Sequence, residues 1–122
     1  MEALVEQIPQ TGNIQLTFQI SARFNYSAVA AQRLVRRFVA DEISYMLRAD
    51  SPVLVAATRV VWRVPIVLAL PTYGAVGQVG SIDVDIETGS FLVTSSQITE
   101  IGLRAREIAD RYSESTTSTT TT

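Results

Sequence analysis

The stretch that decides the fold is LVAATRVVWRVPIVLAL, residues 54–70. Its even-numbered positions are almost all apolar, whereas its odd-numbered positions include Arg59 and Arg63. Alternation of this kind is typical of a β-strand that turns one face to the core. The stretch is longer than an ordinary strand, so we expect a break near Ala57-Thr58 and a main strand over 59–69.

The residues that follow the main strand predict a hairpin. A glycine-rich loop at 71–78 leads into residues 82–87, where Ile and Val alternate with Asp and Glu. Thr88-Gly89 forms a turn in which glycine supplies a positive φ, and residues 90–94 return as a short strand with Phe91 and Val93 inward.

Pro65 interrupts the main strand because it cannot donate a ladder hydrogen bond, so we expect a bulge or an unpaired edge segment there. Upstream, strict alternation predicts a further strand over 14–20. Between these strands, Asn25 or Ser27 can cap an amphipathic helix that runs to about Ala49.

A second helix closes the chain. It begins at a T-x-x-Q capping box at Thr94 and carries an apolar stripe as far as Tyr112. The element order therefore predicts an α+β fold, a four-stranded and mainly antiparallel sheet with both helices packed on one face. The expected organisation is a leader at 1–13, a single domain at 14–112 and a disordered Thr/Ser-rich tail at 113–122.

Three residue types are missing from the composition. The chain has no His, Cys or Lys, and all 10 basic residues are Arg. This excludes imidazole and thiolate catalysis, lysine Schiff bases and the usual zinc ligands, and we expect no cofactor and no metal. The formal net charge of −2 does not favour nucleic-acid binding. We expect no membrane span and, by default, a cytoplasmic location, because Met1–Glu6 does not have the pattern of a signal peptide.

The charged face of the predicted sheet holds the candidate interaction residues. Arg59 and Arg63 lie opposite Asp83 and Asp85 when the hairpin is folded, so we interpret these residues as cross-strand ion pairs rather than as a metal site. Between the charges, apolar Val61 and Val67 make the outer face half apolar. The other candidates for interaction lie on the first helix, in the basic cluster Arg33, Arg36 and Arg37.

Glu42 is the candidate for a buried charge, because it projects from within the apolar face of the predicted first helix. Two readings are open. The carboxylate lies at the edge of the face and reaches water or an arginine, or it is buried with a raised pKa and acts as an acid.

Residues 28–94 resemble a PepSY-type module. The resemblance rests on Trp62-Arg63-Val64, which is similar to that family's W-x-V pattern. It also rests on residues 82–89, IDVDIETG, which are similar to its V-x-V-D-x-x-T-G pattern. It implies a helix followed by three antiparallel strands, and a non-catalytic interaction or inhibitory module.

These observations predict a small non-enzymatic interaction or regulatory protein that associates with itself, as a homodimer, through the outer face of the sheet. One alternative is an antitoxin-like partner of a toxin that uses the Arg33, Arg36 and Arg37 surface or the tail. Another is a hydrolase whose carboxylates come from Glu42, Asp83 or Asp85.

Overall fold

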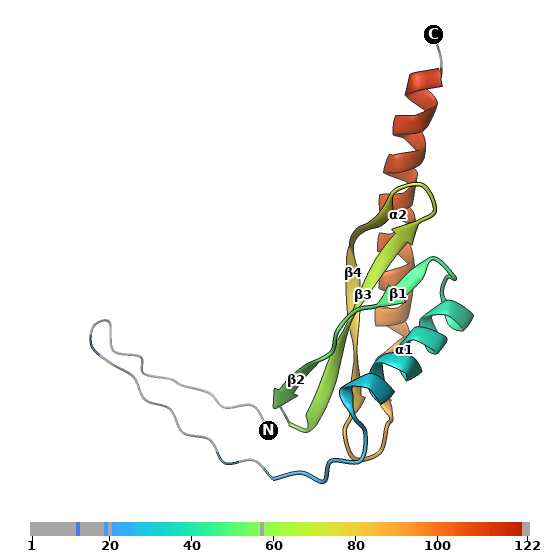
Figure 1. Cartoon of the computed structure of the whole chain (residues 1–122). Coiled ribbons are helices and arrows are strands. Elements are labelled where there is room, and N and C mark those ends of the chain that lie inside the picture. The colour runs from blue at the N-terminus through green and yellow to red at the C-terminus, as the bar shows by residue number, and fades with distance from the viewer. Residues whose placement is uncertain (1–11, 13–18, 20, 57, 121–122) are drawn as a thin grey trace.

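The computed structural model describes residues 12, 19, 21–56 and 58–120, with side chains as far as Ser113. These residues form two helices and an antiparallel sheet of five strands (Figure 1). The elements are α1 (Ala28–Glu42), β1 (Leu47–Ala49), β2 (Val53–Ala56), β3 (Val60–Leu70), β4 (Gly74–Asp85), β5 (Phe91–Leu92) and α2 (Ser95–Thr120). The predicted α+β class is confirmed, while the strand predicted over 14–20 lies outside the described residues.

Strand β3 is the centre of the sheet. It pairs with β4 on one side and with both β1 and β2 on the other, and β5 extends the sheet beyond β4. The predicted break near Ala57-Thr58 is confirmed, because β2 ends at Ala56 and β3 begins at Val60. The first half of the long stretch therefore folds back on the second as a strand of its own. Together with β1, which forms among residues predicted as helix, it brings the described sheet to five strands where four were predicted.

Pro65 is accommodated at an interruption of the neighbouring strands. Its carbonyl accepts a hydrogen bond of 2.9 Å from the Asp50 N–H, in the gap between β1 and β2. The N and O atoms of one strand residue point toward the same neighbouring strand. The position of the N–H group that Pro65 lacks therefore also faces the gap between β1 and β2. The predicted bulge lies one residue further on, at the register shift between Ile66 and Val67.

Helix α1 begins as predicted but ends early. The Ser27 hydroxyl caps it by accepting from the Ala30 N–H, and the helix ends at Glu42 rather than near Ala49. The prediction is wrong for residues 43–49 because tertiary pairing overrides the helical pattern. A continued helix would turn Leu47 away from the apolar face, whereas β1 buries it opposite Leu68 of β3.

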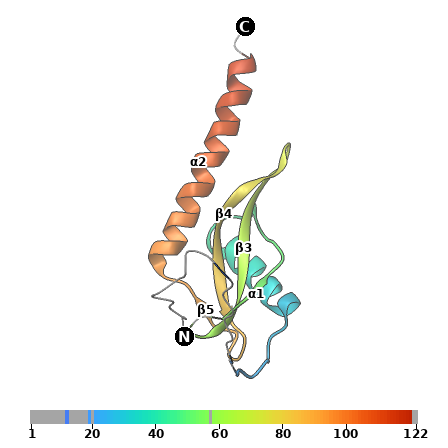
Figure 2. The ribbon, with the colours of Figure 1, turned by 90° about the vertical axis from the view of Figure 1, so that its left-hand side faces the viewer.

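Both helices pack on one face of the sheet. A single buried cluster contains residues of α1 such as Val35 and Val39, of β3 and β4 such as Ile66 and Ile82, and Ile101 of α2. In Figure 2, the opposite face of β3 and β4 is toward the viewer and α1 lies behind the strands. The described residues therefore form two layers, with one face of the sheet, called the open face below, covered by neither helix.

Helix α2 runs further than the sequence predicts. It continues past Tyr112 to Thr120 and extends beyond the sheet in Figure 1. The sequence predicts a disordered tail from 113, whereas the backbone of residues 113–120 is described as part of α2. Residues 113–120 contain no apolar side chain, so no periodic pattern could indicate this part of the helix. Closer to the sheet, the rings of Tyr73 and Tyr112 lie 4.7 Å apart and join α2 to the turn between β3 and β4.

Candidate functional site

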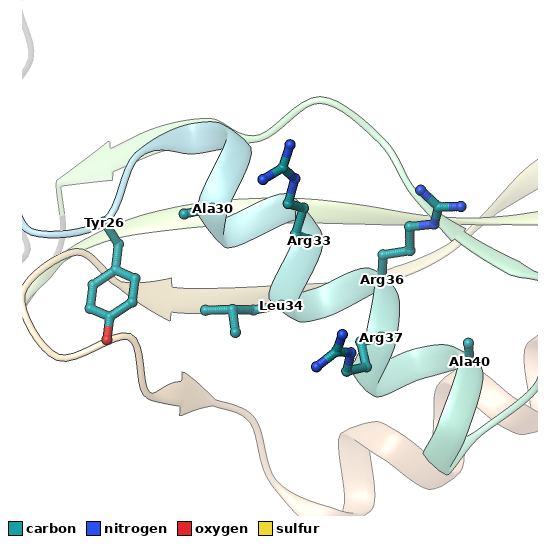
Figure 3. Close-up of a pocket in the computed structure, with 7 residues that line it drawn as sticks. All are labelled: Tyr26, Ala30, Arg33, Leu34, Arg36, Arg37 and Ala40. Atoms are coloured by element: carbon teal, nitrogen blue, oxygen red, sulfur yellow. The ribbon is translucent and has the colours of Figure 1, made fainter.

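The outward face of α1 forms an open groove rich in arginine (Figure 3). Its volume is about 690 Å³. The residues that line it, which we call the α1 arginine groove, are Tyr26, Ala30, Arg33, Leu34, Arg36, Arg37 and Ala40. Residues three and four apart lie on one side of a helix, so this sequence spacing gathers the side chains along a single strip.

The three arginines of the groove form no ion pair within the described part of the chain. Arg33, Arg36 and Arg37 are exposed, and none makes a hydrogen bond or ion pair there. Like charges three and four residues apart on a helix destabilise it by a few tenths of a kcal/mol, about 0.2–0.5 per pair. The cluster therefore does not stabilise the fold.

An apolar strip accompanies these charges. Leu34 is 38% exposed although the helical pattern places it on the apolar face. Tyr26 is half-buried, and its backbone is fixed by hydrogen bonds of 3.0 Å to the Ile86 carbonyl and 2.8 Å from the Trp62 indole. A cationic strip beside an apolar one, on a helix held by the core, is suited to binding an acidic and partly apolar chain.

The charged face of the sheet forms the ion pairs predicted from the sequence. Arg63 donates to both carboxylate oxygens of Asp83, at 2.9 and 3.0 Å, and the two residues are cross-strand partners. The hydrogen bond and charge of Asp83 raise the pKa of Arg63. Arg59 donates to Asp85 at 3.2 Å. Both arginines are thus neutralised within the fold, unlike those of α1.

Asp85 is the buried charge of the described residues, with 4% of its surface exposed. Its carboxylate accepts from the Glu87 N–H at 2.8 Å and from the Thr88 N–H at 3.3 Å, in addition to Arg59. The bond from Glu87 does most to lower its pKa, against the effect of burial, and Thr88 and Arg59 lower it further. The group stays ionised and holds the turn, so it cannot serve as a proton donor near neutral pH. An Asp three residues before a Thr-Gly turn is the signal that could have indicated this role.

Glu42 is exposed, which fits the first interpretation, a carboxylate at the edge of the apolar face that reaches water, and rules out the buried carboxylate. Because α1 ends at this residue, the chain that follows packs on the core in its place, through Ile43 and Met46. Glu42 belongs to an element on the helical face of the sheet, whereas Asp83 and Asp85 belong to the open face. The sheet separates the three carboxylates that a hydrolase would have to combine.

Val61 also differs from its expected place. It is 3% exposed and therefore offers no contact surface, although it lies opposite Asp85 on the charged face. Val67 is half-buried on the open face, and Leu92 of β5 is 38% exposed. The register that turns Phe91 and Val93 inward is confirmed, since both side chains pack against the core. The ring centroids of Phe91 and Phe38 lie 5.0 Å apart.

Comparison of the chain with protein-family models, with curated proteins and with solved structures found no match. The PepSY resemblance therefore stays a prediction. In the described part of the chain, no group of three or more acidic residues is placed to hold a metal ion. Neither helix described is long and apolar enough to cross a membrane.

Proposed function

We propose that this protein is a non-enzymatic interaction module that binds an acidic segment of a partner protein along the α1 arginine groove. The observation that carries the proposal is the set of three exposed arginines that form no ion pair among the described residues, in a chain of net charge −2. Every arginine that is paired with a carboxylate in the described residues lies elsewhere, at Arg59, Arg63, Arg104 and Arg111.

The chemistry of the groove favours a protein segment with carboxylates. A guanidinium group binds a carboxylate through two parallel hydrogen bonds, and arginine and tyrosine are enriched where proteins meet. The apolar surface of Leu34 and Tyr26 suits an apolar side chain between the acidic ones. Because Val35 and Val39 anchor α1 in the core, the helix needs no ordering on binding, which limits the entropic cost. This proposal corresponds to the regulatory alternative in which a partner docks on this arginine surface.

The variant Arg33→Gln, Arg36→Gln, Arg37→Gln tests this proposal. The probe is a fluorescent peptide in which glutamates alternate with leucine and glycine, and the measurement is fluorescence anisotropy at low salt. Each exposed ion pair contributes roughly 0.5–1 kcal/mol, so the triple variant should bind about 10- to 100-fold more weakly. The affinity of the wild type should also fall as salt is added.

A matched control removes the same charge from the other helix. The control is a triple variant on α2, with Arg104→Gln, Arg106→Gln and Arg111→Gln. It should keep the affinity of the wild type within about threefold. Equal loss of affinity in both triple variants would mean that the peptide responds to net charge alone, and the groove would not be the binding site.

Self-association through the open sheet face is a second candidate, favoured by the row Val53, Arg63, Asp83 and Leu92 across four strands. Val53 is 58% exposed, so apolar side chains flank a central ion pair on a face that neither helix covers. We expect sedimentation equilibrium to show a dimer, and Leu92→Lys to weaken the dimer about tenfold. A monomer at high protein concentration would contradict this candidate.

A further inference from the structure

A second hollow opens between α1 and β1, on the other side of Arg33 and Arg36 from Leu34. Its volume is about 270 Å³. The residues that line it, which we call the α1–β1 hollow, are Val29, Gln32, Arg33, Arg36, Arg48 and Ala49. Three of the six carry a guanidinium group and none carries a carboxylate, so the hollow concentrates positive charge from two elements.

The two walls of the hollow are tied together. The Gln32 side-chain amide donates to the Ala49 carbonyl at 2.9 Å, which joins α1 to β1 across the floor. On β1, the Nη1 group of Arg48 donates to the carbonyls of Tyr45 at 2.7 Å and Leu47 at 3.1 Å. These bonds fix the direction of the guanidinium group, while its Nη2 and Nε donors make no bond within the described chain. A cation held in place in advance loses little entropy when an anion binds.

We propose that the α1–β1 hollow binds a phosphomonoester group, the phosphorylated side chain of an acidic partner segment. A phosphomonoester carries a charge of about −1.5 to −2 and three strong acceptor oxygens, which three guanidinium groups can match and a single carboxylate cannot. The hollow is smaller than the cavities that enclose drug-sized ligands, which suits a group the size of phosphate.

The inference rests on the proposed function, because Arg33 and Arg36 border both the hollow and the groove. Arg48 borders the hollow alone, whereas Arg37 borders the groove alone. This division separates the two claims. Arg48 should govern the effect of phosphorylation, and Arg37 should govern the affinity for acidic residues in general.

The experiment compares three labelled peptides of one acidic sequence that differ at one position, which holds serine, glutamate or phosphoserine. Each is titrated into the wild type, Arg48→Gln and Arg37→Gln. In the wild type the phosphoserine peptide should bind about tenfold more tightly than the serine peptide and more tightly than the glutamate peptide. Arg48→Gln should reduce this advantage to about twofold or less without changing the affinity for the serine peptide. Arg37→Gln should weaken all three peptides equally.

Further measurements identify the source of the anion and guard against misfolding. Inorganic phosphate should displace the phosphoserine peptide from the wild type, and a single-stranded oligonucleotide of equal charge should displace it less well. Arg48→Lys keeps the positive charge but loses the planar pair of guanidinium N–H donors. It should retain part of the tighter binding of the phosphoserine peptide. Thermal unfolding of each Arg48 variant confirms that it is folded.

Different outcomes overturn different claims. A phosphoserine advantage that is absent, or that survives Arg48→Gln in the folded protein, overturns the phosphate site and leaves the groove intact. Tighter binding of the oligonucleotide than of the phosphoserine peptide would assign the hollow to nucleic acid, and this too would overturn the proposal of a phosphomonoester site. A phosphoserine advantage that depends on Arg48, together with no effect of Arg37→Gln, overturns the groove instead.

Discussion

Gly89→Ala should lower the free energy of unfolding by about 2–4 kcal/mol. Gly89 has a φ of +73°, which an L-residue adopts only at a cost. A methyl group there would also overlap the ring of Tyr26. The Tyr26 main chain is held by hydrogen bonds to Ile86 and from Trp62, so the ring can yield only by rotating about its side-chain bonds. Chemical denaturation of the variant measures the loss.

Gly74→Ala is the matched control for this prediction. Gly74 has the same φ of +73°, but a methyl group there would meet nothing within 4 Å. The control should therefore lose only the backbone cost, about 1–2 kcal/mol. Equal losses of unfolding free energy in the two variants would show that the contact between the turn at Gly89 and the Tyr26 ring does not contribute to stability. Because Tyr26 also lines the α1 arginine groove, Gly89→Ala should weaken binding of the acidic peptide as well.

Asp85→Ala should cost about 1–3 kcal/mol, because it removes the buried carboxylate that accepts from the N–H groups of Glu87 and Thr88 at the turn. Asp83→Ala is its control on the same strand. Asp83 pairs with a half-exposed Arg63, so the Asp83→Ala variant should lose less than about 1 kcal/mol of unfolding free energy. Urea denaturation at neutral pH compares the two variants, and equal losses would mean that the turn is held by other contacts.

Asp85 also sets a pH dependence. Its folded pKa lies below the ordinary value of 3.8. The unfolded chain therefore takes up the proton first, and stability is complete well above 3.8 and declines as the pH falls through this value toward the lower folded pKa. Asp85→Asn should flatten this decline between neutral pH and acid. An unchanged slope in this variant would assign acid sensitivity to other carboxylates.

Much of the sheet follows from local sequence pattern. Alternation in residues 60–70 marks β3, and alternation in 82–87 marks the second half of β4. The glycine-rich loop predicted at 71–78 is wrong from Gly74 on, because these residues pair with β3 as the first half of β4. Thr88-Gly89 marks the turn that reverses the chain. The ends of elements depended on tertiary contacts instead. β1 forms where the helical period still continues, because pairing with β3 buries Leu47 better than a longer helix would.

The candidate site was visible in part. The cluster of Arg33, Arg36 and Arg37 is plain in the sequence, yet whether a carboxylate neutralises it depends on the fold. The predicted helix placed Arg48 on the same face as Arg33 and Arg37 but about three turns beyond Arg37, whereas it lies on β1 and borders the same hollow as Arg33 and Arg36. The choice between the two interpretations of Glu42 also depended on the fold, since the helix that placed it within the apolar face ends at this residue.

Nuclear magnetic resonance of the isotopically labelled protein, titrated with the acidic peptide, tests the central claim most directly. The account predicts that the amide signals that shift belong to α1, above all to Arg33, Arg36 and Arg37, and to Tyr26 beside them. Shifts that instead cluster on the open sheet face around Val67 and Leu92, with the signals of α1 unmoved, would contradict it.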